Sequence, residues 1–250
     1  MCMKLTLAEP RLLIASIGVI SDLVNAVRFR IDKNSIELVA MDPANVAMVI
    51  FKLLSSAFTE YQVEKPVEIA IGLESFKAIL RRVKPADVLT IELDQEKNRL
   101  RVRLKSDSVR TFHLALIDIE EKEQKIPELN FPVKVEMNST VLDDAIYDMD
   151  VVAESVALIA QKGKFVVEAE SNMNDAHAEI MEDEETKITG AKTEVRSKYS
   201  IEYMKKIIKG SKLAPRVSLQ FNKDYPLRVD YTVKDKLSFS VILAPRVSND

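Results

Sequence analysis

Carboxylates are the side chains of this sequence whose spacing comes closest to a catalytic pattern. The stretch EDEET, from Glu182 to Thr186, has four adjacent carboxylates that could hold Mg²⁺, and converging carboxylates support metal-assisted hydrolysis. A run of adjacent acids is more often a solvated loop, which is the interpretation we favour. The two histidines, His113 and His177, lie in strand-like segments without an evident catalytic partner, and we interpret both as structural.

Other catalytic patterns are missing from the sequence. It contains five glycines, no phosphate-binding loop and a single cysteine, Cys2. We therefore predict no catalytic residue, no metal and no cofactor. A lone cysteine suits a reducing compartment, and the apolar run from Leu12 to Ile20 is too short to cross a bilayer. Because Glu9-Pro10 ahead of that run argues against a signal peptide, we expect a cytoplasmic protein.

The basic side chains are segregated, although the chain of 250 residues carries a net charge of −3. A predicted helix over 73–84 carries four cations against Glu74, and one over 201–212 carries four against Glu202, a net of +3 each. Such helices are often merely solvated. Lys and Arg on helices also meet phosphates without reading bases, and that binding weakens with salt. With Arg11 from an earlier predicted helix, the candidate phosphate-facing residues are Lys77, Arg81, Arg82, Lys84, Lys205, Lys206, Lys209 and Lys212.

The two basic helices belong to a pattern that occurs twice in the sequence. Four segments of the first half match four of the second half at an offset of 127–130 residues. The matched pairs are NSIELVA (34–40) with GKFVVEA (163–169), LESFKAIL (73–80) with IEYMKKII (201–208), VLTIEL (88–93) with VSLQF (217–221), and RLRVRL (99–104) with PLRVDY (226–231). A near-constant offset indicates a duplicated unit. We predict an α+β fold with two copies, each with two helices packed on antiparallel sheets.

Local patterns predict the first elements of each copy. The first copy is expected to contain a strand, a helix and two more strands, at 5–7, 10–26, 27–31 and 36–40. The second copy is expected to repeat that order at 133–139, 141–154, 156–160 and 165–169. Residues 118–132 are acidic and contain two prolines, which predicts an interdomain connecting loop. We accordingly place one domain at 1–117 and the other at 133–250.

The stretch MDPANVAMV, from Met41 to Val49, is a soft apolar segment that follows a turn signal. Together with the duplication, the IPE of the acidic linker and the C-terminal LAPRV, it resembles proliferating cell nuclear antigen (PCNA), the sliding clamp of archaea and eukaryotes. The resemblance covers the whole chain. The ending LAPRVSND looks closer to archaeal members.

The resemblance implies a closed homotrimeric ring whose helices line a central hole around duplex DNA. It implies a processivity factor for DNA polymerase, with no catalytic activity of its own. Partners of the family are DNA polymerase, a clamp loader, flap nuclease and ligase, which dock short peptide motifs. The implied location is the cytoplasm of an archaeal cell, or the nucleus of a eukaryotic one.

The resemblance also assigns a partner-peptide groove. Methionine is polarizable and adaptable, which suits a site that serves many partners. Gln124 and Ile242 occupy places where other members carry a larger or more apolar side chain. Carried over by position, the residues that would line the groove are Met41, Val46, Met48, Ile126, Pro226, Ile242, Ala244 and Pro245.

The ring is expected to close by edge pairing between the strand at 108–116 and its counterpart at 175–181, head to tail. The predicted helix over 141–154 carries five acids and no cation. Its acids are expected to pair with cations of the neighbouring subunit, which fixes register more than it adds affinity. The candidate interface residues are Arg82, Lys84, Val109, Arg110, Phe112, Asp143, Asp144, Asp148, His177 and Ile180.

Three alternatives remain open at this point. The chain could be one subunit of a heterotrimeric clamp formed with paralogues, and the acidic helix keeps that alternative open. It could be a metal-dependent nucleic-acid enzyme that uses the acidic clusters. It could also be a duplicated scaffold protein without a DNA role.

Overall fold

A computed structural model describes residues 3–119 and 124–246 of the chain. Cys2, residues 120–123 of the predicted linker and the last four residues of LAPRVSND lie outside the described residues. The chain divides into two compact units. Unit 1 comprises Met1–Met41, Val49–Lys125 and Val233–Phe239, and unit 2 comprises Asp42–Met48, Ile126–Thr232 and Ser240–Asp250. Unit 2 therefore includes a short turn from the first half of the sequence.

The first half of the described chain contains, in order, β1 (Met3–Leu7), α1 (Arg11–Leu23), β2 (Ala26–Ile31), β3 (Ser35–Met41), β4 (Ala47–Leu54), a 3₁₀ turn (Ser55–Ala57), β5 (Glu60–Val63), β6 (Val67–Gly72), α2 (Leu73–Leu80), β7 (Val88–Asp94), β8 (Arg99–Lys105) and β9 (Val109–Ala115). The second half contains β10 (Val133–Asn138), α3 (Ser139–Asp150), β11 (Ser155–Gln161), β12 (Lys164–Glu170), β13 (Asp175–Met181), β14 (Lys187–Thr189), β15 (Val195–Ser200), α4 (Ile201–Ile207), a 3₁₀ segment (Ile208–Lys212), β16 (Arg216–Phe221), β17 (Leu227–Val233) and β18 (Leu237–Leu243). The order of helices and strands is the same in both halves, which confirms the predicted duplication and the α+β class.

The helices are shorter than the sequence pattern predicts. Helix α1 ends at Leu23, and Ala26 already belongs to β2. Helix α4 ends at Ile207 and tightens into a 3₁₀ segment that contains the buried Gly210. A Cβ atom at Gly210 would lie 2.3 Å from the ring of Tyr231, so only glycine lets the backbone pass this close to the ring. The apolar pattern continues into this segment, which is why it resembles a longer helix.

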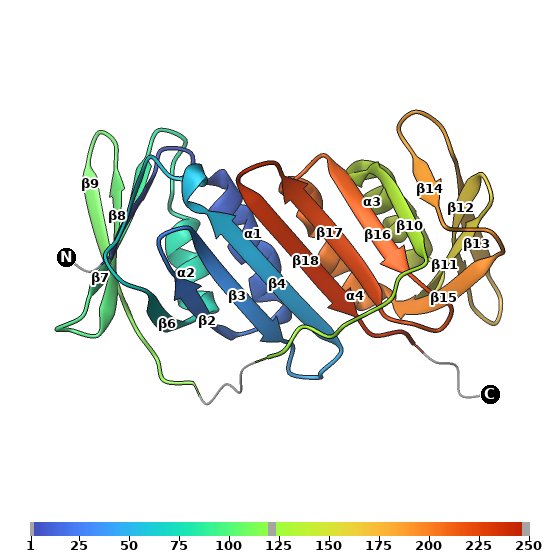
Figure 1. The fold of residues 1–250 in the computed structure, drawn as a ribbon, viewed down its shortest axis with the longest axis horizontal. Coiled ribbons are helices and arrows are strands. Elements are labelled where there is room, and N and C mark those ends of the chain that lie inside the picture. The colour runs from blue at the N-terminus through green and yellow to red at the C-terminus, as the bar shows by residue number, and fades with distance from the viewer. Residues whose placement is uncertain (1–2, 120–123, 247–250) are drawn as a thin grey trace. The chain divides into compact units, whose positions relative to one another are not determined.

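Unit 1 is built on antiparallel strands that bury one face. One sheet has the order β5-β1-β7-β8-β9, and β2 pairs with both β3 and β6. In β1, Met3, Leu5 and Leu7 are buried while the residues between them are partly exposed, as the alternation of side chains along a strand requires. Helices α1 and α2 contact each other behind β2, β3 and β4 (Figure 1).

Unit 2 has the same construction. One sheet has the order β13-β12-β11-β15, and β14, β10, β16 and β17 follow one another in a second sheet. Helix α3 turns Leu142, Ile146 and Met149 inward, a spacing of three and four residues that places them on one helix face. Helices α3 and α4 contact each other and lie behind β10, β16 and β17 (Figure 1).

The predicted edge strands lie at the ends of sheets. Strand β9 ends the five-stranded sheet and β13 ends the four-stranded one, and alternate side chains of both strands are exposed. The sequence led us to expect that these two strands are counterparts within the duplication, and this expectation is wrong. In the repeated order, β13 corresponds to β4 and β9 corresponds to β18, and both of those strands are largely buried. Short matching segments did not reveal this because β4 was not predicted as a strand.

Within residues 3–119 and 124–246, no helix combines the length and the apolar character that crossing a membrane would require.

Candidate functional site

The predicted phosphate-facing cations divide into two groups in the structure. Arg81, Arg82 and Lys84 follow the end of α2, and all three are exposed. Lys209 and Lys212 are likewise exposed in the 3₁₀ segment after α4, and Arg11 is exposed at the start of α1. These six residues present positive charge to solvent in their own unit.

The other three predicted cations are engaged by carboxylates of their own unit. The Lys77 Nζ lies 3.0 Å from an oxygen of Asp22, and the Lys205 Nζ lies 2.6 Å from an oxygen of Asp150. Lys206 contacts Glu202 at 2.9 Å and lies over the ring of Tyr203, 5.0 Å from its centroid. Sequence spacing alone does not reveal these partners, apart from Glu202, which is four residues before Lys206.

A buried carboxylate organises the turn that carries Lys84. Asp87 is buried and accepts hydrogen bonds from the backbone N–H of Lys84, the hydroxyl of Ser106 and the guanidinium of Arg110. These hydrogen bonds, that of the Lys84 amide first, lower the pKa of Asp87 to about 2. Arg110 also donates to the carbonyl oxygen of Arg82 at 2.9 Å. Arg110, a candidate interface residue, is thus engaged within its own chain, and a role between subunits stays a prediction.

The stretch MDPANVAMV forms a strand, a turn and a second strand. Met41 ends β3 and Ala47 begins β4, with the turn between them centred on the buried Asp42. The carboxylate of Asp42 accepts hydrogen bonds from three turn amides, at 2.6–3.1 Å. The Tyr203 hydroxyl donates a fourth, at 2.6 Å. The turn is therefore fixed by one carboxylate.

The ionisation of this pair follows from its surroundings. Burial opposes the charge of Asp42, but the hydrogen bonds from Tyr203 and from the amides outweigh it, and the pKa of Asp42 is lowered. Burial and the neighbouring carboxylate raise the pKa of Tyr203 to about 12. At neutral pH the carboxylate is therefore ionised and the phenol is protonated, which is the combination that the hydrogen bond needs.

A pocket of about 990 Å³ lies in unit 2 beside this turn. Its apolar walls include Val46, Tyr203 and Pro245, and the backbone N–H of Ala244 donates to the carbonyl of Val46 at 2.9 Å. Tyr147 and Val151, at the end of α3, also line the pocket and are 48% and 86% exposed. Exposed apolar side chains that gather in one patch with polar residues around it mark a candidate contact area.

The structure separates the predicted groove residues. Val46, Ala244 and Pro245 line the pocket. Met48 and Ile242 are 5% and 7% exposed and pack into the core. The other residues outside the pocket wall are the exposed Ile126, the half-buried Pro226 and Met41, which is half-buried in unit 1.

Sequence reasoning missed Tyr203, Tyr147 and Val151 as pocket residues, and it missed Asp42 as the residue that fixes the turn. A tyrosine inside the lysine-rich segment IEYMKK was the available signal for Tyr203. Nothing in the local pattern indicates that its hydroxyl reaches Asp42.

The candidate interface acids are not equally available. Asp144 and Asp148 are exposed on α3. Asp143 is half-buried and hydrogen-bonded to Ser211, and burial raises the pKa of its carboxyl group. Along the edge strands, Val109 and His177 are exposed, and Phe112 and Ile180 are partly exposed.

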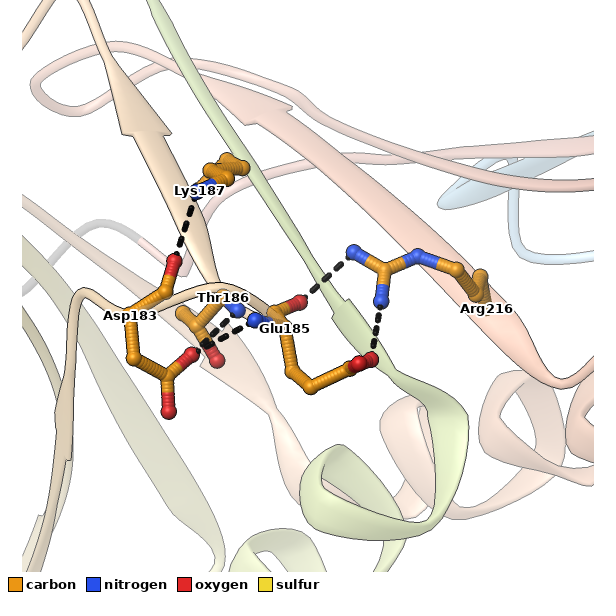
Figure 2. Close-up of polar contacts among 5 residues, drawn as sticks. All are labelled: Asp183, Glu185, Thr186, Lys187 and Arg216. Atoms are coloured by element: carbon orange, nitrogen blue, oxygen red, sulfur yellow. Dashed lines mark hydrogen bonds and ion pairs between the residues drawn. The ribbon is translucent and has the colours of Figure 1, made fainter.

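The acidic loop after β13 is organised by its own backbone, as Figure 2 shows. The carboxylate of Asp183 accepts hydrogen bonds from the backbone N–H groups of Glu185 and Thr186, and its carbonyl accepts one from Lys187. The guanidinium of Arg216 holds both the carboxylate and the carbonyl of Glu185. These contacts give Asp183 and Glu185 structural roles. Across the described parts of the chain, no group of three or more His, Cys, Asp or Glu side chains is arranged to hold a metal ion.

Comparison with known proteins covers both halves of the chain. The family model "Proliferating cell nuclear antigen, N-terminal domain" matches residues 2–125, and the corresponding C-terminal model matches residues 125–246. Duplicated α+β domains with these matches define a clamp-type protein. The chain belongs to the PCNA family.

Curated relatives support this assignment. A protein named DNA polymerase sliding clamp from Thermococcus gammatolerans is 36% identical over 232 residues, 92% of this chain and 93% of the relative. The protein with that name from Nanoarchaeum equitans is 32% identical over 247 residues, 98% of this chain and 99% of the relative. The crystal structure of PCNA from Thermococcus kodakaraensis matches with a TM-score of 0.91 at 27% identity, over 98% of this chain and all of that one.

Proposed function

We propose that this chain is a DNA sliding clamp that acts as a processivity factor for DNA polymerase. The observation that carries the proposal is the match of PCNA-family models to both halves, together with relatives named DNA polymerase sliding clamp over more than nine-tenths of their length. In this proposal three copies form a ring around duplex DNA. The hold on DNA is topological, so weak phosphate contacts suffice, and weak contacts permit sliding.

The two sheet edges support the ring. Strands β9 and β13 each leave one side without a strand neighbour in their own sheet. Such edges are a template for pairing with another chain. A head-to-tail contact that closes on itself makes a ring.

The pocket beside the Asp42 turn supports the tethering of partners. It combines apolar walls at Val46, Tyr203 and Pro245 with a rim of charged side chains, which is the composition of a peptide-binding site with a central anchor. We propose that replication and repair enzymes, among them DNA polymerase, the clamp loader, flap nuclease and ligase, place short peptide motifs there.

The proposed function is tested by primer extension with a replicative DNA polymerase and its clamp loader. On a circular primed template, the wild-type chain is expected to lengthen the products of a single polymerase binding event. On a linear template with free ends the effect is expected to disappear, because a ring slides off. Equal stimulation on both templates, or none on either, would contradict a topological clamp.

Light scattering behind a sizing column distinguishes the homotrimer from the heterotrimeric alternative. A mass near three chains supports the homomeric ring. A monomer that gains activity only with paralogous subunits would instead support a heterotrimer.

A further inference from the structure

An ion pair between the two helices of a unit occurs in both units. In unit 1 it joins Asp22 of α1 to Lys77 of α2 at 3.0 Å, and in unit 2 it joins Asp150 of α3 to Lys205 of α4 at 2.6 Å. Both lysines are the fifth residue of their helix. Each is also the first cation of the basic segment that was expected to face phosphates.

The aspartates of the two ion pairs occupy different positions in their helices. The buried residues Leu13, Ile17 and Ile20 of α1 match Leu142, Ile146 and Met149 of α3 at an offset of 129 residues. In that register Asp22 corresponds to the position after Asp150, so the two aspartates are one residue out of step. Asp22 is the second-last residue of α1, and Asp150 is the last residue of α3. The same lysine contact is therefore made in both units although the helices do not superimpose residue by residue.

Both pairs lie where solvent reaches them. The side chains of Lys205 and Asp150 are 40% and 37% exposed, and those of Lys77 and Asp22 are 25% and 22% exposed. Partly exposed ion pairs add little to stability, because water screens the attraction and holding two side chains costs entropy. Stability alone is therefore a weak reason for the contact to occur twice.

We propose that Asp22 and Asp150 are built-in counter-ions that limit how strongly Lys77 and Lys205 bind DNA phosphates. This inference rests on the proposed function. A phosphate that approaches either lysine must share it with the carboxylate or displace it, so the net gain from that contact is small. The exposed Arg81, Lys84 and Lys212 supply further attraction for phosphates. The combination attracts the duplex while keeping the contacts easy to exchange, which is what sliding requires.

The test uses single charge removals in the full chain. Asp150→Asn removes one negative charge and releases Lys205. Glu96→Gln is the matched control, because Glu96 is exposed in the turn between β7 and β8 and its loss changes the net charge equally. Asp22→Asn repeats the experiment in unit 1. Binding to a short linear duplex, which a ring can enter from its ends, is measured by fluorescence anisotropy over a series of salt concentrations.

Asp150→Asn and Asp22→Asn are each expected to bind the duplex several-fold more tightly than the wild type at low salt. The slope of log K against log salt is expected to steepen by about 0.9 for each lysine that gains a phosphate. Glu96→Gln should leave the slope unchanged. Thermal unfolding of all variants verifies that each is folded before its slope is compared.

Two results would overturn the inference. Slopes for Asp150→Asn and Asp22→Asn equal to that of Glu96→Gln would show only a general charge effect. Weaker binding would show that the pair holds the lysine in its DNA-binding position. A wild-type chain that fails to lengthen products on the circular primed template would contradict the proposed function itself. The salt slopes test only the inference, so the two failures are distinguishable.

Discussion

The Tyr203 hydroxyl donates a hydrogen bond of 2.6 Å to the carboxylate of Asp42, a residue 161 positions away in the sequence. This contact joins α4 to the turn that carries Val46. Because Val46 and Tyr203 both line the pocket, the hydrogen bond sets the shape of the pocket wall as well as the position of the turn.

Tyr203→Phe is expected to weaken the binding of partner peptides and to lower the free energy of unfolding by about 1.5–3 kcal/mol. The carboxylate of Asp42 is buried, and a hydrogen bond to a charged buried group contributes about this much. Isothermal titration with a partner peptide and chemical denaturation measure the two effects. Tyr147→Phe, at an exposed tyrosine of the same pocket, is the control and should change stability little. If Tyr203→Phe and Tyr147→Phe changed peptide affinity and stability equally, the hydrogen bond to Asp42 would not be the cause.

The double variant Arg81→Ala, Lys209→Ala is expected to bind duplex DNA more weakly than the wild type. The mass of the assembly is expected to stay the same. For every phosphate that is no longer neutralised, the salt slope should become shallower by about 0.9. Anisotropy titrations measure the slope, and light scattering measures the mass. Lys162→Ala, in the exposed turn between β11 and β12, is the control for a general decrease in positive charge. An unchanged slope in the double variant would show that Arg81 and Lys209 do not contact DNA phosphates.

Asp87→Asn is expected to destabilise the chain at neutral pH and to flatten its acid sensitivity. The folded pKa of about 2 lies below the ordinary value of 3.8. The ionised carboxylate therefore stabilises the fold above about pH 4, and this contribution is lost as the pH falls toward 2. Thermal midpoints measured from pH 7 to acid should converge for wild type and variant. A constant difference across that range would contradict this account.

Val109→Asp is expected to dissociate the ring without unfolding the chain. Val109 is 57% exposed on the edge strand β9, so a charge there is tolerated by the single chain but opposes pairing with another strand edge. Light scattering should show a single-chain mass while circular dichroism stays unchanged. Val151→Asp, at the exposed end of α3, should leave the mass as it is. A trimer that persists in Val109→Asp would exclude β9 as the interface strand.

Much of the fold could be predicted because it depends on local patterns. Helix α1, strands β2 and β3, and their repeats after Val133 are visible as apolar periodicity. Strand β4 was missed, because MDPANVAMV was interpreted as a soft apolar segment after a turn signal and not as a hairpin turn followed by a strand. The ends of α2 and α4 were overestimated, since the apolar and basic pattern continues through the turns that follow them.

The sequence by itself determined the duplication, the family and the segments that carry the basic residues. These properties follow from residue order and composition, which any alignment of the chain with itself or with a family reads directly. The tertiary structure alone decided which charges are engaged. Asp42 meets Tyr203, Asp22 meets Lys77 and Asp87 meets Arg110 because folding brings distant elements within hydrogen-bond distance. Charged and polar groups at these distances interact far more strongly than the same groups separated along an extended chain in water.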